Sequence, residues 1–258
     1  MNNKFDYYGN SYVVHFLGEI DANNVNYIYS PQKKNISAEG EQIRNQKWQE
    51  NLIKDPKSYD GDLVEFIKLE NNGNKIDLYF DYTKYSYTIA TRSAEYKHLL
   101  EKGEYVSNHI AIPTIIKTTD NKMLIGSQLT KVEGVLKWKF TGGFWEKKAE
   151  TVLDNVNKEI QEEIGDLQIS NPKIIGIFSV KNSTTIITTA EVNMTSNQLK
   201  QFMEDNKDTV PDSWEMSEIQ FVNIDEYTLN SFINNPNIKL GSMGAIAVYS
   251  LIEWVKRR

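Results

Sequence analysis

Cysteine is absent from the 258 residues, and histidine and proline are scarce, with three and six copies. The lack of cysteine excludes disulfide bonds, thiolate nucleophiles and cysteine-ligated metal sites. The three histidines stand singly, without the spacing of metal ligands, so we expect each to be structural or exposed. These absences remove the chemistry of sulfur and of histidine clusters from consideration.

The sequence also lacks a basic surplus and a long apolar run. Its net charge is −6, which does not indicate a nucleic-acid partner. No apolar run is long enough to span a bilayer, and residues 1–22 lack the basic and apolar regions of a secretory signal. We therefore expect no nucleic-acid partner, no membrane partner and a cytoplasmic location. Nothing in the sequence predicts the oligomeric state.

The composition that remains indicates a globular α+β protein. Charged residues make up 25% of the chain. Hydrophobic residues make up 40%, which is enough to form a hydrophobic core. We expect a smaller N-terminal α+β domain over residues 1–104 and a second domain over residues 105–258. No linker rich in Pro, Gly or Ser separates them, so we expect the two halves to pack together.

Local patterns predict the secondary structure of both halves. In the first half we expect a strand at 11–20, a helix at 37–54 and a hairpin at 71–74, then "YSYTIATR" and a short helix ending at Gly103. In the second half we expect strands on both sides of "TTDNK", a strand "LKWKFTGG", and a hairpin of "PKIIGIFSV" with "STTIITTAEV". A helix "SNQLKQFMED", a strand "EIQFVNIDE" and two further helices complete the prediction, with Trp138 and Phe140 directed into the core.

The segment from Thr151 to Ile164 has the features of an amphipathic helix. Thr151 and Asp154 have the form of a capping box, and Gly165 is the expected residue after the helix end. An apolar stripe repeats every four positions, at Val152, Val156, Ile160 and Ile164. We expect this stripe to face a core.

Three glutamates project from nearly one side of this helix, at the edge of the apolar stripe: Glu159, Glu162 and Glu163. Each like-charge pair costs roughly 0.2–0.5 kcal/mol, and half-buried carboxylates cost more unless a cation neutralises them. A hard divalent cation, Mg²⁺ first, would remove both costs. The alternative is a solvated acidic face. A strand ending in Gly142-Gly143 favours the cation, because it leaves backbone groups open where a metal and phosphates can bind.

The segment from Gly143 to Gly165 resembles the Nudix box, G-x5-E-x7-R-E-U-x-E-E-x-G-U, where U is a bulky apolar residue. "KEIQEEIG" matches its second half, with Lys158 in the arginine position and Glu150 eight residues earlier. Six residues rather than five separate Gly143 from Glu150, and lysine cannot make the forked contact of arginine. Asp166 occupies the final apolar position. The resemblance implies an α/β/α sandwich with a mixed sheet from about residue 106 onward.

The resemblance also implies an activity and the residues that carry it. Nudix hydrolases cleave a phosphoanhydride in a nucleoside diphosphate linked to another group, with Mg²⁺, or alternatively Mn²⁺. The family pattern assigns four metal ligands here: Glu159, Glu162, Glu163 and a carbonyl at Gly142. Glu162 would also be catalytic, and Gly143 and Lys158 would contact the substrate.

The general base is expected on a loop before a late strand, where relatives carry a pattern like E-S-x-x-x-x-F-V. "SWEMSEIQFVNIDE" offers Glu215, six residues before Phe221, and also Glu218. The spacing favours Glu215. For either residue the alternative is an exposed loop glutamate without a catalytic role.

The N-terminal half loosely resembles the leading domain of UDP-sugar-cleaving Nudix hydrolases. The shared features are Trp48, Asn51, Pro56, Gly61, Tyr85 and Ala90-Thr91-Arg92. We expect Arg92 to contact a substrate phosphate. Three functions stay open: a metal-dependent pyrophosphohydrolase, with a UDP-sugar as its expected substrate; a nucleotide-sensing or partner-binding Nudix module without turnover; and a broad hydrolase of (d)NTPs or ADP-ribose.

Overall fold

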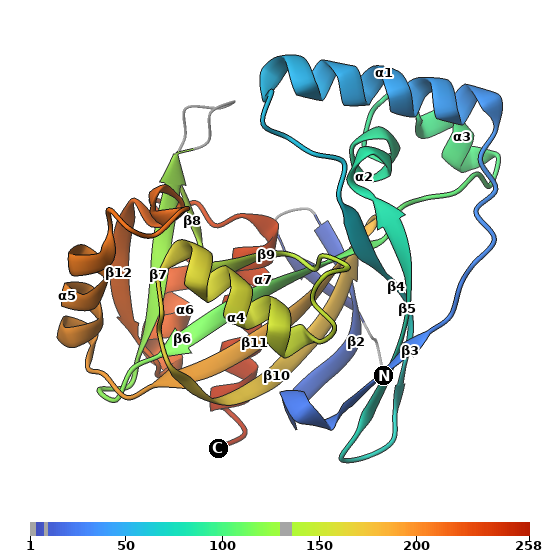
Figure 1. Ribbon diagram of the computed structural model, residues 1–258. Helices are drawn as coiled ribbons and strands as arrows, with labels where there is room; N and C mark the ends of the chain where they lie inside the picture. Colours follow the sequence, from blue (N-terminus) through green and yellow to red (C-terminus); the bar gives the residue numbers. More distant parts are fainter. Residues whose placement is uncertain (1–3, 8–9, 130–135) are drawn as a thin grey trace.

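The computed structural model describes residues 4–7, 10–129 and 136–258 (Figure 1). Its strands form one mixed sheet of twelve, with the main order β1-β2-β10-β11-β6-β4-β5-β3. Strand β7 pairs with β6, β8 and β12, and β9 pairs with β6. The pairs β6/β11 and β3/β5 are parallel, and the others are antiparallel.

The strands have the following bounds: β1 Lys4–Tyr7, β2 Asn10–Asp21, β3 Val25–Tyr29, β4 Asp62–Asn71, β5 Ile76–Lys84, β6 His109–Lys117, β7 Lys122–Leu129, β8 Leu136–Lys139, β9 Thr141–Phe144, β10 Ile169–Val180, β11 Ser183–Val192 and β12 Glu218–Asn223. The helices are α1 Ala38–Lys54, α2 Tyr85–Thr91, α3 Lys97–Glu101, α4 Val152–Glu163, α5 Ser196–Asn206, α6 Glu226–Ile233 and α7 Ser242–Val255, with short 3-10 turns η1 Ala22–Asn24 and η2 Ser213–Met216. Within the described residues, no helix is long and apolar enough to cross a membrane.

Helices cover both faces of the sheet, as expected for an α/β/α sandwich. In Figure 1, α4 lies in front of the sheet and α7 lies behind it. Strand β6 is buried along its whole length, and its side chains alternate between the two layers. Ile112 packs in the same apolar cluster as Ile160 of α4, whereas Ile115 packs in the cluster of Ile246 of α7. Trp138 and Phe140 are buried, as predicted.

The two halves of the chain share this sheet and its core. Strand β2 pairs antiparallel with β10, from Asp21 opposite Lys173 to Val13 opposite Ser179. Leu78 of β5 lies in the same cluster as the apolar side of α4. The predicted packing of the two halves is therefore confirmed. The boundary between residues 104 and 105 stays a prediction.

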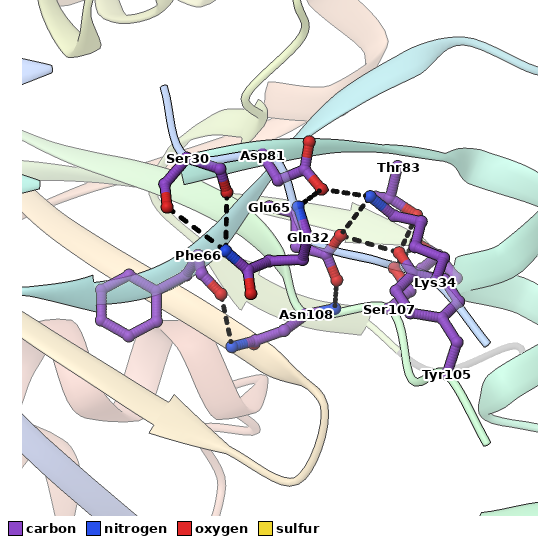
Figure 2. Close-up of polar contacts among 11 residues, drawn as sticks. Ser30, Gln32, Lys34, Glu65, Phe66, Asp81, Thr83, Tyr105, Ser107 and Asn108 are labelled. Atoms are coloured by element: carbon purple, nitrogen blue, oxygen red, sulfur yellow. Dashed lines mark hydrogen bonds and ion pairs between the residues drawn. The ribbon is translucent and has the colours of Figure 1, made fainter. Parts of the chain in front are cut away.

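A buried polar network fixes the segment between the halves (Figure 2). Glu65 accepts hydrogen bonds from the Asn108 N–H at 3.0 Å and from the Tyr105 hydroxyl at 2.8 Å. Lys34 forms ion pairs with Glu65, at 3.5 Å, and with Asp81. Both carboxylates are only 4% exposed, so these partners offset a large desolvation cost. The segment at residues 105–108 is thus held against β4.

Local structure in the N-terminal half follows the sequence at most positions. The predicted hairpin forms between β4 and β5, with Gly73 at φ +77°. Helix α1 begins after Ser37, whose hydroxyl accepts the N–H of Gly40. "YSYTIATR" becomes helix α2, and Asp60 supports its first turn by accepting from both the N–H and the hydroxyl of Ser86 at 2.8 Å.

Candidate active site

Helix α4 is held in place at both ends and along its apolar stripe. Thr151 and Asp154 form the predicted capping box, and Gly165 adopts φ +117°. The stripe residues are buried: Val152, Val156, Ile160 and Ile164. This packing leaves Glu159 only 8% exposed and Glu163 only 3% exposed. The two carboxylates thus lie at the border of the core, as the helical spacing predicts.

The glycine pair on β9 lies directly against Glu159. A Cβ atom added to Gly143 would lie 2.7 Å from Oε2 of Glu159, so the carboxylate rests on the glycine backbone. Gly142 has φ +139°, and a Cβ there would come within 2.1 Å of the Ile112 carbonyl oxygen on β6. Only glycine fits either position without displacing its neighbours.

Lys139, at the end of β8, joins Glu163 to Glu215. Its Nζ lies 2.8 Å from Oε1 of Glu163 and also forms an ion pair with Oε2 of Glu215. The other oxygen of Glu163, Oε2, is buried without a hydrogen-bond partner. Burial raises the pKa of Glu163 to about 8, with Lys139 acting in the opposite direction. Such a carboxylate is stabilised by any further cation that reaches it.

A second lysine, Lys158 on α4 itself, lies among three carboxylates. Its Nζ is 2.9 Å from Oε2 of Glu162, 3.2 Å from Oε1 of Glu159 and 3.6 Å from Oε1 of Glu146. Glu146 is held in turn by the hydroxyl of Tyr59, which donates to its Oε1 at 2.7 Å. Tyr59 belongs to the N-terminal half, so that half contributes to the positioning of this cluster.

Glu150, the residue at the box spacing, has an exposed side chain. Glu146, four residues earlier, lies beside Lys158 instead. The sequence pattern did not indicate Glu146 or Lys139. The extra residue between Gly143 and Glu150 was a signal that another glutamate could take this place, and no motif pointed to Lys139.

Glu215 lies on η2, which is tied to both α4 and β7. The N–H of Asp212 donates to the carbonyl of Glu162 at 2.8 Å. Met216 packs so closely on β7 that a Cβ on Gly126 would lie 2.3 Å from its Sδ atom. These contacts bring Glu215 to the Lys139 ammonium that also binds Glu163, so residues far apart in sequence meet at one place.

A cavity of about 1130 Å³ lies at the junction of the two halves. Its lining includes the basic side chains of Arg92, Lys97 and Lys181, and none of the described residues that line it is acidic. Phe144, directly after the glycine pair, also lines it. Arg92 Nη2 lies 2.9 Å from Nε2 of His109. Because successive strand residues face opposite sides, β9 separates this cavity from the carboxylates beside Gly143.

The free energy of unfolding should decrease between pH 7 and pH 5 through His109. Burial first, and the charge of Arg92 second, lower the pKa of His109 from 6.5 to about 3. Below pH 6.5 the unfolded chain binds a proton that the folded protein does not, so this contribution is present above pH 6.5 and is lost as pH falls toward 3. At pH 5 the loss is about 2 kcal/mol. Urea unfolding at both pH values should show a smaller loss for His109→Gln; an equal loss would contradict the assignment.

Comparison with known proteins decides the family. The family model described as the NUDIX domain matches residues 107–240, more than half of the chain. The chain belongs to the Nudix family. Membership makes it a hydrolase that acts on phosphorus-containing anhydrides. No curated protein matches the sequence.

Three solved structures resemble the chain, and each match covers 56% of the chain's length. A Nudix hydrolase from Nitrosomonas europaea is 12% identical over 88% of its own length, with a TM-score of 0.39. The ORF135 protein of E. coli is 15% identical over 88%, with a TM-score of 0.37. The MutT protein of Methanosarcina mazei Go1 is 14% identical over 92%, with a TM-score of 0.37.

The Nudix carboxylates fit a hard divalent cation by their chemistry. Within the described part of the chain, no three carboxylate or histidine side chains already surround one point. The unpartnered Oε2 of Glu163 nevertheless offers a buried ligand oxygen, and Glu159 lies on the Gly143 backbone. The cluster holds five carboxylates against two lysines: Glu146, Glu159, Glu162, Glu163 and Glu215 against Lys139 and Lys158. An excess of negative charge on oxygen ligands is what Mg²⁺ or Mn²⁺ requires.

Glu215→Gln should lower kcat of the Nudix reaction with little change in KM, whereas Glu218→Gln should be close to wild type. Glu215 shares Lys139 with Glu163, while Glu218 is exposed at the start of β12. Loss of a general base or of a group that orients water reduces the rate by roughly 10²–10⁴-fold. Steady-state kinetics of both variants measure this. Damage by Glu218→Gln alone would reverse the assignment.

Proposed function

We propose that the protein is a divalent-metal-dependent pyrophosphohydrolase that cleaves a nucleoside diphosphate linked to a second group. The observation that carries the proposal is the pair of buried carboxylates Glu159 and Glu163 on α4, with Glu159 directly against Gly143. The unpartnered oxygen of Glu163 supports cation binding at this place. When bound, Mg²⁺ or Mn²⁺ would neutralise phosphate charge and make water a better nucleophile.

Residues of the chain would hold the cation, accept a proton from water and position the carboxylates. Glu159, Glu162, Glu163 and the Gly142 carbonyl would hold the cation. Glu215 would accept a proton from the attacking water, since η2 fixes it beside the Glu163 side of the cluster. Lys158 would hold three carboxylates in place, because its ammonium reaches Glu146, Glu159 and Glu162. The contact of Lys158 with substrate stays a prediction.

For the substrate we propose a nucleoside diphosphate sugar, with UDP-glucose or a close relative as the first candidate. The three basic side chains around the large cavity support a ligand with several negative charges, and Arg92 suits a phosphate. Gly143 faces the carboxylates and Phe144 faces the cavity, so both places flank one short strand. The cavity would hold the second half of a two-part ligand that passes around β9. We further propose that the protein acts in the cytoplasm.

A nucleotide-sensing module without turnover is the second candidate. The observation in its favour is that Lys139 and Lys158 already neutralise part of the carboxylate cluster. A broad hydrolase of dGTP or ADP-ribose is the third. The three differ in whether product forms and in which substrate is consumed first.

The deciding experiment supplies UDP-glucose, ADP-ribose and dGTP at equal concentrations with Mg²⁺ or Mn²⁺ and follows each by chromatography. We expect UDP-glucose to disappear first, giving UMP and glucose 1-phosphate, and a chelator to stop the reaction. Consumption of dGTP or ADP-ribose first by a wide margin would refute the sugar assignment. Absence of turnover, with binding retained, would favour the sensing module.

Arg92→Ala tests, in the same assay, whether the cavity binds the substrate. We expect KM for UDP-glucose to rise about tenfold or more, since a hydrogen bond to a charged group is worth roughly 1.5–3 kcal/mol. Arg258→Ala is the matched control, because Arg258 bonds Glu19 at the C-terminal end of the fold. If Arg92→Ala leaves KM unchanged while UDP-glucose is still cleaved, the cavity is not the sugar site.

A further inference from the structure

The ammonium of Lys139 lies between the carboxylates of Glu163 and Glu215, which belong to different elements of the fold. The lysine stands at the end of β8, Glu163 on the last turn of α4 and Glu215 on η2. Its Nζ is 2.8 Å from Oε1 of Glu163 and pairs with Oε2 of Glu215 as well. The side chain of Glu163 is only 3% exposed, so its charge has little help from water.

An ammonium and a divalent cation would compete for the carboxylate of Glu163. Both are compact positive charges that bind carboxylate oxygen at short range. Two such cations on one carboxylate, Lys139 at Oε1 and a divalent ion at the unpartnered Oε2, would repel each other strongly in a buried site. The Lys139 side chain is 21% exposed and has a flexible four-carbon stem, so its ammonium has a route outward when Glu163 binds another ion.

We propose that Lys139 is a tethered counter-ion that competes with the divalent cation for the Glu163 carboxylate and is displaced from it when that cation binds. The inference rests on the metal site of the proposed function. Lys139 keeps Glu163 neutralised within the core while no divalent ion is bound, and it lowers the apparent affinity for the ion. Lys158 also pairs with two proposed ligands, Glu159 and Glu162, but their side chains are 11% and 37% exposed, so water already helps to stabilise their charges.

The test is a calorimetric titration of chelator-treated protein with Mn²⁺ alone, without substrate. Lys139→Met keeps the length of the side chain and removes its charge. We expect Kd for Mn²⁺ to fall roughly tenfold or more in Lys139→Met, because the competing charge is gone. The matched control is Lys117→Met, which removes a comparable ion pair, 2.8 Å from Glu191, outside the carboxylate cluster. Lys117→Met should bind Mn²⁺ with wild-type affinity.

Thermal unfolding gives a second readout of the same competition. In chelator, Lys139→Met should melt below wild type, since Glu163 loses its partner, and Mn²⁺ should raise its Tm by more than it raises the wild-type Tm. Equal or weaker Mn²⁺ binding by folded Lys139→Met, with normal binding by wild type, would overturn the role of Lys139 and leave the metal site intact. Absence of Mn²⁺ binding in every protein would overturn both proposals.

A measurement on the wild type alone covers the case in which Lys139→Met does not fold. Acetylation of individual lysines, followed by mass spectrometry, reports how accessible each ammonium is. Saturating Mn²⁺ should increase the modification rate of Lys139 severalfold, because displacement exposes it, while the rate at Lys117 stays unchanged. An unchanged rate at Lys139 in protein that binds Mn²⁺ would overturn the proposal.

Discussion

Glu163→Gln should lower kcat by about 100-fold or more and weaken the binding of Mg²⁺ or Mn²⁺. Glutamine keeps the size of the side chain but cannot carry the negative charge that a bound cation would stabilise on Glu163, and it removes one strong ligand oxygen. Loss of that charge removes several kcal/mol of stabilisation from a transition state built on phosphate charge, which is the expected origin of the rate decrease. Steady-state kinetics with each metal, together with a metal titration, measure both effects.

Glu150→Gln is the matched control for this change. Glu150 stands at a position of the sequence motif, but its side chain is exposed. We expect its kcat to stay within a few-fold of wild type. Wild-type rates from folded Glu163→Gln, or an equal loss in both variants, would remove Glu163 from the metal site.

Gly142→Ala should destabilise the fold by roughly 2–6 kcal/mol. An alanine at φ +139° would be strained by about 1–3 kcal/mol, and its Cβ would lie 2.1 Å from the Ile112 carbonyl oxygen. Relief of that collision would require β9 to separate from β6, at a further cost of about 1–3 kcal/mol. Urea unfolding followed by fluorescence measures the change in free energy.

Gly73→Ala separates the two sources of this loss. Gly73 also has a positive φ, +77°, but nothing lies within 4 Å of a Cβ atom there. The variant therefore carries the backbone strain without the collision, and it should lose clearly less stability than Gly142→Ala. Equal losses would show that close packing of β9 on β6 contributes nothing.

The sequence predicted the parts of the site that depend on local spacing. The capping box at Thr151, the apolar stripe and the glycine after α4 define a helix and its rotation within one segment. That rotation places Glu159 and Glu163 at the border of the core without reference to any other part of the chain. The family followed from the same segment, because the glutamates and glycines stand at fixed separations.

The rest of the candidate site depends on contacts between distant segments. Lys139 and Glu215 reach Glu163 from β8 and η2, and no local pattern encodes that meeting. Glu146 lies beside Lys158 because Tyr59, from the other half of the chain, holds it there. The motif spacing falls on the exposed Glu150, because it counts residues along the chain and not the path of a loop. The role of Arg92 stays a prediction.

The pairing of β2 with β10 has a consequence for how the protein is made. Phe16 of β2 lies opposite Ile177 of β10. Strand β2 therefore emerges from the ribosome well before β10, the strand that completes its hydrogen bonds. The C-terminal segment arrives later still, when Trp254 donates to Glu19 at 2.6 Å. Such distant contacts slow folding, because a large loop must close before they form. During synthesis β2 carries unpaired backbone groups, so a chain that stalls before β10 exposes an edge to which another chain can add a strand.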